Sequence, residues 1–264
     1  MSAVPWTVVI LAGERRGGDP FAQSLGVPHK GLIRVGGRPM LLRVLETFRQ
    51  LPGVGRIVVV TNTREALLGD RELHTALAAP EVELVEAEGC IADSILCLAG
   101  GRRDCWPMLV TTADHALLTP AMAADLMAAS RDVDIAIGMV DRRVMLTARP
   151  GTRRTWLAFR GGAYTGANLF VLRNAGVLGA IGFWKSMERD RKTGWRLFAR
   201  CGPWLFLLVM LRRIGLDEAL ARLGLRFGVR VRAVLLADAE AGIDVDTAGD
   251  LALADRILAE RGAA

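Results

Sequence analysis

Apolar, β-branched runs alternate with segments of helical pattern over the first 141 residues of this 264-residue chain. The runs predict buried strands at residues 7–11, 56–62, 82–87, 107–114 and 134–140. The segments between them predict helices at 39–49, 64–78, 91–101 and 119–131, the last with Thr119 as its N-cap. Strand and helix alternating at this spacing predict an α/β fold whose sheet is mostly parallel and flanked by helices.

The pattern changes after Arg142. Residues 145–172 read as antiparallel β-structure with turns, and a helical stretch, a strand at 230–236 and a closing helix at 247–261 follow. No internal repeat or low-complexity linker interrupts the chain. We therefore expect a single domain over 1–264, with a small antiparallel and helical lobe beside the parallel sheet.

The composition is that of a globular, basic protein, with 52% hydrophobic residues, a formal charge of +6 and a pI near 9.7. Such a charge favours an anionic partner, and nucleic acid, anionic lipid and phosphorylated metabolites all qualify. The four cysteines show no Cys-x-x-Cys spacing and suggest small buried side chains in a reducing compartment. The N-terminal apolar run has no basic start and opens into a glycine loop, so we expect a cytoplasmic protein without a signal peptide.

One apolar run, at 203–211, is too short to cross a bilayer, which takes roughly 20 apolar residues. Two interpretations stay open for it. It is either a buried helix or, together with Trp195, Trp204 and the flanking arginines, a helix at the membrane interface. The second interpretation predicts peripheral membrane contact through residues 195–211.

The loop after the first strand carries the pattern of a phosphate-binding site. It reads "LAGERRGG" and runs on to Lys30, one of only three lysines against thirty-one arginines. The dinucleotide fingerprint fails here because the loop lacks G-x-G-x-x-G and the second strand ends in "VTNT" without a carboxylate. The P-loop fails because "HKG" stands where Gly-Lys-Ser/Thr is needed.

A set of motifs extends from this loop through nearly the whole chain. It begins with these residues: Leu11, Ala12, Gly13, Arg15, Arg16, His29, Lys30, Gly37, Arg38, Pro39 and Met40. It continues through "GCIADSI", "VTTADHALLTP", "YTGANLFVL" and "GIDVDTAGDLALAD". In these motifs and their order the chain resembles the nucleotidyltransferases that make nucleoside-diphosphate-linked metabolites, of the molybdenum-cofactor (MobA-like) and methylerythritol-phosphate cytidylyltransferase type.

The resemblance implies a Rossmann-like sheet with a nucleotide-binding half at 1–142 and an acceptor-binding half at 143–264. It also implies transfer of a nucleoside monophosphate from a triphosphate to a phosphorylated small molecule, with release of pyrophosphate and without nucleic acid. Leu11, Ala12 and Gly13 would lie against the nucleotide, since a glycine lets backbone amides approach phosphates. Arg15 and Arg16 would bind the β- and γ-phosphates, and Lys30 would follow charge on the α-phosphate.

Two departures from the family pattern stand out. Arg15 replaces the usual glycine, and "GGDPFAQSLGVPHK" lengthens the loop and has His29 where proline is usual. Which arginine contacts the phosphates therefore stays open, with Arg15 slightly favoured.

A magnesium ion is the cofactor that the resemblance implies. Asp114 follows the fourth predicted strand and is the residue to which the resemblance carries a magnesium ligand. Mg²⁺ prefers one or two carboxylates with phosphate oxygens, so a second acid should converge on it. Asp246 aligns best with that role, with Asp244 as the alternative. A helix N-cap is the competing explanation for Asp246.

The base and the acceptor are the least constrained features. Gly89 and Ser94 in "EGCIADSI" resemble the cytidylyltransferase segment near the nucleotide, which favours CTP over GTP, with a guanylyltransferase as the alternative. Thr165, Gly166 and Asn168 resemble acceptor-pocket residues of the sugar-phosphate relatives, and an amide can bind hydroxyls as donor and acceptor together. A nucleotide-sugar glycosyltransferase would need Asp-x-Asp at the end of the fourth predicted strand, and it is disfavoured because "TADHAL" holds a single carboxylate. A non-catalytic nucleotide-binding protein is the remaining alternative.

Overall fold

The computed structural model of the chain describes residues 4–14, 17–101, 104–189 and 202–263. It divides into two compact units. The first contains Met1–Ala87, Pro107–Ala124 and Ile243–Ala264, and the second contains Glu88–Trp106 and Asp125–Gly242. The unit boundaries therefore lie elsewhere than at residue 142, and the organisation as one domain with two halves stays a prediction.

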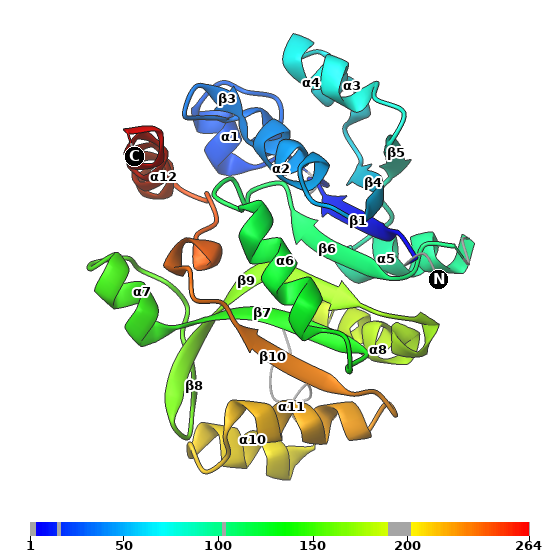
Figure 1. Cartoon of the computed structure of the whole chain (residues 1–264), viewed down its shortest axis with the longest axis vertical. Helices are drawn as coiled ribbons and strands as arrows, with labels where there is room; N and C mark the ends of the chain where they lie inside the picture. The colour runs from blue at the N-terminus through cyan, green and yellow to red at the C-terminus, as the bar shows by residue number, and fades with distance from the viewer. Residues whose placement is uncertain (1–3, 15–16, 102–103, 190–201, 264) are drawn as a thin grey trace. The chain divides into compact units, whose positions relative to one another are not determined.

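The first unit holds four parallel strands, in the order β6 (Met108–Thr112), β1 (Trp6–Leu11), β4 (Val54–Thr61) and β5 (Val82–Glu86) (Figure 1). The apolar runs of β1 and β4 are buried, as expected for strands covered on both faces. The carboxyl ends of all four strands lie along one edge of the sheet, which is where open α/β sheets bind ligands.

The helices of the first unit correct one prediction. Residues 64–78 do not form one helix but two, α3 (Arg64–Leu68) and α4 (Arg71–Leu77). The break lies at Gly69–Asp70, because the Asp70 carboxylate accepts hydrogen bonds from the amides of Glu72 and Leu73, both at 3.0 Å, and so starts a new helix. The other helical elements are α1 (Pro20–Ser24), η1 (Lys30–Leu32), α2 (Met40–Arg49) and α12 (Ala248–Ala263), while α6 (Pro120–Ala129) starts in this unit.

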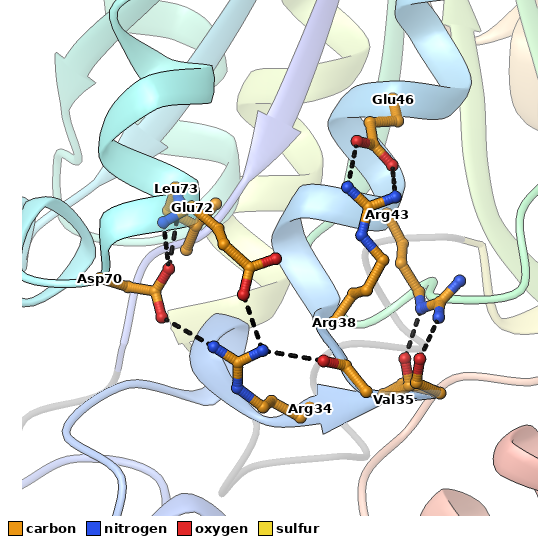
Figure 2. A network of polar contacts seen from close by, with 10 residues as sticks. Arg34, Val35, Arg38, Arg43, Glu46, Asp70, Glu72 and Leu73 are labelled. Atoms are coloured by element: carbon orange, nitrogen blue, oxygen red, sulfur yellow. Dashed lines mark hydrogen bonds and ion pairs between the residues drawn. The ribbon is translucent and has the colours of Figure 1, made fainter.

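A short hairpin, β2 (Arg34–Val35) and β3 (Arg38–Pro39), leads into α2. Gly36 and Gly37 both have positive φ, as the tight turn between the strands requires. Figure 2 shows how charged side chains hold this hairpin: Arg34 reaches Asp70 and Glu72, and Arg38 pairs with Glu46 through two 2.6 Å hydrogen bonds. Arg38 of the Gly-Arg-Pro-Met motif thus has a structural partner on α2.

The second unit combines parallel and antiparallel pairing. Strand β10 (Val231–Leu235) pairs parallel with β7 (Ile135–Asp141), while β9 (Gly162–Leu172) pairs antiparallel with β7 and with β8 (Leu157–Phe159). The helical elements are α5 (Ile91–Gly101), α7 (Arg142–Ala148), η2 (Ala175–Val177), α8 (Leu178–Arg189), α10 (Pro203–Met210), α11 (Leu216–Leu225) and η3 (Ala239–Gly242). The predicted α/β class with a mostly parallel, helix-flanked sheet and a small antiparallel part is confirmed.

Helix α7 overlaps residues for which antiparallel β-structure was expected. That expectation was wrong for 145–148, because Asp141 ends β7 and caps a helix by accepting a 2.7 Å hydrogen bond from the Arg143 amide. The antiparallel pair predicted farther along is present as β8 and β9.

Helix α10 contradicts one of the two interpretations of the apolar run at 203–211. From Trp204 to Leu211 every residue is half-buried or exposed, so the interpretation as a buried helix was wrong. Residues 190–201, which include Trp195, lie outside the described residues. Among the helices that the structure describes, none has both the length and the apolar character that a membrane crossing requires.

Candidate active site

Three charged side chains from distant parts of the first unit meet at the carboxyl edge of its strands. The Lys30 ammonium donates a hydrogen bond to Asp114 Oδ2 at 2.6 Å and another to Asp246 Oδ1. The partners are 84 and 216 residues away in the sequence. The side chains of Lys30 and Asp114 are 17% and 18% exposed, whereas that of Asp246 is 55% exposed. Two carboxylates therefore share one cation in a partly open site.

The electrostatics of this group favour the charged lysine. Burial by itself would lower the pKa of Lys30, but the charges and hydrogen bonds of Asp114 and Asp246 outweigh it and raise that pKa well above its ordinary value. The ammonium is therefore protonated at any physiological pH. It is a permanent cation at the place where the sequence predicted phosphate binding.

Backbone contacts explain why Asp114 and Asp246 converge. Asp114 follows β6, and its carboxylate accepts a hydrogen bond from the Thr112 hydroxyl. The Asp114 carbonyl accepts a 3.1 Å hydrogen bond from the Val245 amide, which draws the segment before α12 to the end of β6. Asp246 is the next residue and its side chain turns to Lys30.

The helix cap of α12 is supplied by Thr247, not by Asp246. The Thr247 hydroxyl accepts a 3.2 Å hydrogen bond from the Asp250 amide and donates one of 2.7 Å to the Asp250 carboxylate. The competing explanation for Asp246, a helix N-cap, therefore finds no support in the cap geometry. Its carboxylate is engaged with Lys30 instead.

Gly13, in the loop after β1, has a backbone amide that a ligand could use as a donor. Ala12 is buried, and Gly13 beyond it is exposed. The φ of Gly13 is not in the left-handed region, and a Cβ there would meet Ala87 and Asn62 only at ordinary contact distances. Among the described residues, nothing accepts a hydrogen bond from the Gly13 amide. The fold itself thus does not require glycine at this position, which is consistent with a ligand approaching the backbone.

Two side chains outside the predicted site residues hold this loop. Asn62, at the end of β4, accepts a hydrogen bond from the Glu14 amide and donates one to the Glu14 carbonyl, each 2.8 Å. The Glu14 carboxylate in turn accepts a 2.7 Å hydrogen bond from the Lys30 amide. The asparagine in "VTNT" was the available signal, because it stands at the strand end where the dinucleotide folds carry an acid.

His29 links the same two segments from the buried side. Its Nε2 donates to the Ala12 carbonyl at 2.8 Å and its Nδ1 accepts from the Gly31 amide at 2.8 Å, which defines a neutral imidazole. Burial lowers the pKa of His29, and its hydrogen bond to Ala12 and the charges of Glu14 and Asp19 oppose that effect only in part. His29, which replaces the usual proline, therefore positions both the glycine loop and Lys30.

The predicted phosphate ligands Arg15 and Arg16 lie outside the described residues. Their roles stay predictions. The residues on either side, Glu14 and Gly17, are described, so the loop leaves the carboxyl end of β1 beside Lys30.

Gly89 and Ser94 belong to the second unit and shape the start of α5. Gly89 has a φ of +51°, and a Cβ there would lie 2.4 Å from the Asp93 carboxylate. The buried Ser94 hydroxyl donates to the Glu88 carbonyl and accepts from the Glu88 amide, both at 3.1 Å. Both residues therefore order their own loop, and a contact with the nucleotide stays a prediction.

The predicted acceptor residues all lie on β9 of the second unit. Thr165 is buried, Gly166 is exposed, and Asn168 has a φ of +45° where the pairing of β7 with β9 shifts register. Asparagine is one of the few residues that tolerate this backbone conformation. The irregular strand accounts for Asn168 locally, and acceptor binding by these three residues stays a prediction.

The sequence and the fold match a known group of proteins. The sequence model of the MobA-like NTP transferase domain matches residues 8–176. The bifunctional enzyme IspD/IspF of Solidesulfovibrio magneticus is 35% identical over 86 residues, which are 32% of this chain and 21% of that protein. The chain thus spans about a fifth of the length of this curated relative.

Two solved structures share the fold. A hypothetical transferase from Thermus thermophilus has a TM-score of 0.78 at 25% identity, covering 94% of this chain and 99% of its own. A CMP:2-keto-3-deoxy-manno-octonic acid synthetase, solved in complex with CTP, has a TM-score of 0.61 at 14% identity, covering 97% of this chain and 99% of its own.

Proposed function

The chain belongs to the MobA-like NTP transferase domain family, as its motifs predicted, and we propose that it transfers CMP from CTP to a phosphorylated small-molecule acceptor. An oxygen of the acceptor phosphate attacks the α-phosphorus and forms a new phosphorus–oxygen bond. The bond between the α-phosphorus and the bridging oxygen breaks, and pyrophosphate leaves with that oxygen. The observation that carries this proposal is the group Lys30, Asp114 and Asp246, which the Glu14 carboxylate joins to the loop of the exposed Gly13.

Lys30 would stabilise the negative charge that develops on the α-phosphate. Its amide is held by Glu14 and the turn around it by His29, so its backbone is fixed while the flexible stem can move the ammonium. In the structure the ammonium is bound to two carboxylates. When the phosphates arrive it can turn to them, because they offer more negative charge.

Asp114 and Asp246 are the residues that would hold a magnesium ion. Both accept hydrogen bonds from one nitrogen, so their oxygens already converge on a single cation position. In the described part of the chain no group of three or more metal-binding side chains occurs, and the further ligands would be phosphate oxygens and water, as Mg²⁺ prefers. When bound, the ion supplies charge neutralisation of the phosphates and fixes the leaving pyrophosphate.

The preference for CTP rests on likeness. Gly89 and Ser94 stand in a segment that resembles the cytidylyltransferases. The structure of the similar CMP:2-keto-3-deoxy-manno-octonic acid synthetase was determined with CTP. A guanylyltransferase of the molybdenum-cofactor type is the alternative, and the family model is compatible with it. Arg15, Arg16, Thr165, Gly166 and Asn168 are proposed as phosphate and acceptor contacts on the resemblance alone.

A pyrophosphate-release screen tests the proposal. CTP, GTP, UTP and ATP are each combined with Mg²⁺ and a panel of phosphorylated sugars and polyols, and the Lys30→Ala variant is the matched control. We expect release with CTP and one acceptor class, abolished in the variant. Release with GTP alone would establish the guanylyltransferase instead. Nucleotide binding by calorimetry without release on any acceptor would indicate a non-catalytic binding protein.

A further inference from the structure

Helix α10 exposes large apolar side chains to an unusual degree for its length. Trp204 is 67% exposed and Met210 63%, and Leu207 and the following residue Leu211 are exposed as well. From Trp204 to Met210 every residue of the helix is apolar. A helix that is apolar on all sides is normally covered by a protein core or by lipid.

The apolar area continues beyond the helix. Helix α10 contacts strand β8, where Leu157 is also exposed. A 2.8 Å hydrogen bond from the Arg160 amide to the Ile214 carbonyl joins the end of β8 to the segment after α10. We call Leu157, Trp204, Leu207, Met210 and Leu211 the α10 surface. Isolated exposed apolar residues are ordinary, but a group of five on contacting elements marks an interaction site.

Positive charge borders this surface. Arg212 and Arg213 follow α10, are exposed, and form no ion pair in the described part of the chain. No acidic residue occurs between residues 202 and 216, and the next acids are Asp217 and Glu218 in the first turn of α11. An apolar patch with a tryptophan and a cationic edge is complementary to an anionic lipid headgroup layer above acyl chains.

We propose that the α10 surface docks on the surface of an anionic lipid bilayer. The eight residues of α10 span about 12 Å, far less than a bilayer core of about 30 Å, so the helix lies on the membrane and does not cross it. A second copy of this chain could also cover the apolar side chains, and the test below distinguishes it from a membrane. This proposal does not depend on the proposed transferase activity.

Vesicle flotation of the full chain tests the proposal. We expect the protein to float with vesicles of equal parts phosphatidylglycerol and phosphatidylcholine at low salt, and much less with phosphatidylcholine alone. The double substitution Leu207→Glu with Met210→Glu should abolish flotation, because it places two charges in the apolar contact. Arg212→Gln and Arg213→Gln should each weaken binding about fivefold, and added salt should weaken it further.

Leu25→Glu is the matched control, since Leu25 is an exposed leucine of the first unit and should leave flotation unchanged. Thermal unfolding by circular dichroism verifies that each variant is folded. The proposal is overturned if the wild type fails to float with anionic vesicles at low salt, or if the α10 variants float as well as the wild type. It is also overturned if the wild type is a dimer that the α10 variants convert to monomer without any lipid binding.

Discussion

His29 offers a sharp test of how the candidate site is held together. Its ring joins the Ala12 carbonyl on one segment to the Gly31 amide on another, each at 2.8 Å, and the residue is 1% exposed. His29→Ala removes both contacts. His29→Asn removes only the contact with the Ala12 carbonyl. Asparagine is a good N-cap, and its side-chain oxygen can still accept a hydrogen bond from the Gly31 amide.

The expected cost follows from counting the groups left without partners. Ala12 and Gly31 are buried, and a buried donor or acceptor that loses its partner costs about 1–3 kcal/mol. His29→Ala should therefore lower the free energy of unfolding by about 2–6 kcal/mol, and His29→Asn by about half as much. Turnover should fall in both variants, because the link between the glycine loop and Lys30 is lost.

Urea unfolding at pH 8, followed by circular dichroism, measures these differences. His74→Ala is the matched control, because His74 is exposed on α4, and its cost should stay below about 0.5 kcal/mol. Equal costs for His29→Ala and His29→Asn would refute the role of the Gly31 contact, and no cost for His29→Asn would refute the role of the Ala12 contact. A cost below about 1 kcal/mol for His29→Ala would refute the conclusion that the His29 ring holds the Ala12 and Gly31 segments together.

The free energy of unfolding below pH 6.5 gives a second test of the two hydrogen bonds of His29. Burial lowers the pKa of His29 below its ordinary value of 6.5, so the unfolded chain binds more protons than the folded one between these two values. Stability must then rise with pH in that window. The contribution of His29 is fully present above pH 6.5 and is lost as the pH falls toward the lowered pKa. The stability difference between wild type and His29→Asn should therefore shrink below pH 6.5.

Three further predictions concern the charged group and the second unit. Lys30→Ala should lower kcat by about 10²–10³-fold with little change in nucleotide affinity, measured by pyrophosphate release and calorimetry, and equal losses in both would make Lys30 a ground-state anchor only. Asp246→Asn should lose Mg²⁺-dependent activity with α12 intact, since Thr247 supplies the cap. If that variant keeps normal Mg²⁺ dependence, the second ligand must be sought at Asp244. Ser94→Ala should lower the free energy of unfolding by about 0.5–1.5 kcal/mol, because it removes the hydrogen bonds of a buried hydroxyl to the Glu88 backbone, and an unchanged urea midpoint would contradict this.

The strands of both units follow from local sequence. β-Branched runs such as Val8–Ile10 can be stable only where both faces are covered, and the glycines and prolines between them end each element. The two errors in secondary structure arose where a short polar side chain redirected the backbone. Asp70 starts a second helix inside a helical pattern, and Asp141 starts one inside a β pattern. Either side chain could equally have lain in a loop, and periodicity does not distinguish these outcomes.

By itself the sequence determined the parallel α/β fold, the family, and the placement of Asp114 and the Gly13 loop at one edge of the sheet, because these depend on patterns within single elements. Only the tertiary structure decided that the Lys30 ammonium lies between Asp114 and Asp246, that His29, Glu14 and Asn62 join the two loops, and that α10 is exposed. Hydrogen bonds and ion pairs act over a few ångströms, and burial depends on every element packed nearby. Contacts between residues as far apart as Lys30 and Asp246 therefore exist only once the whole first unit has folded.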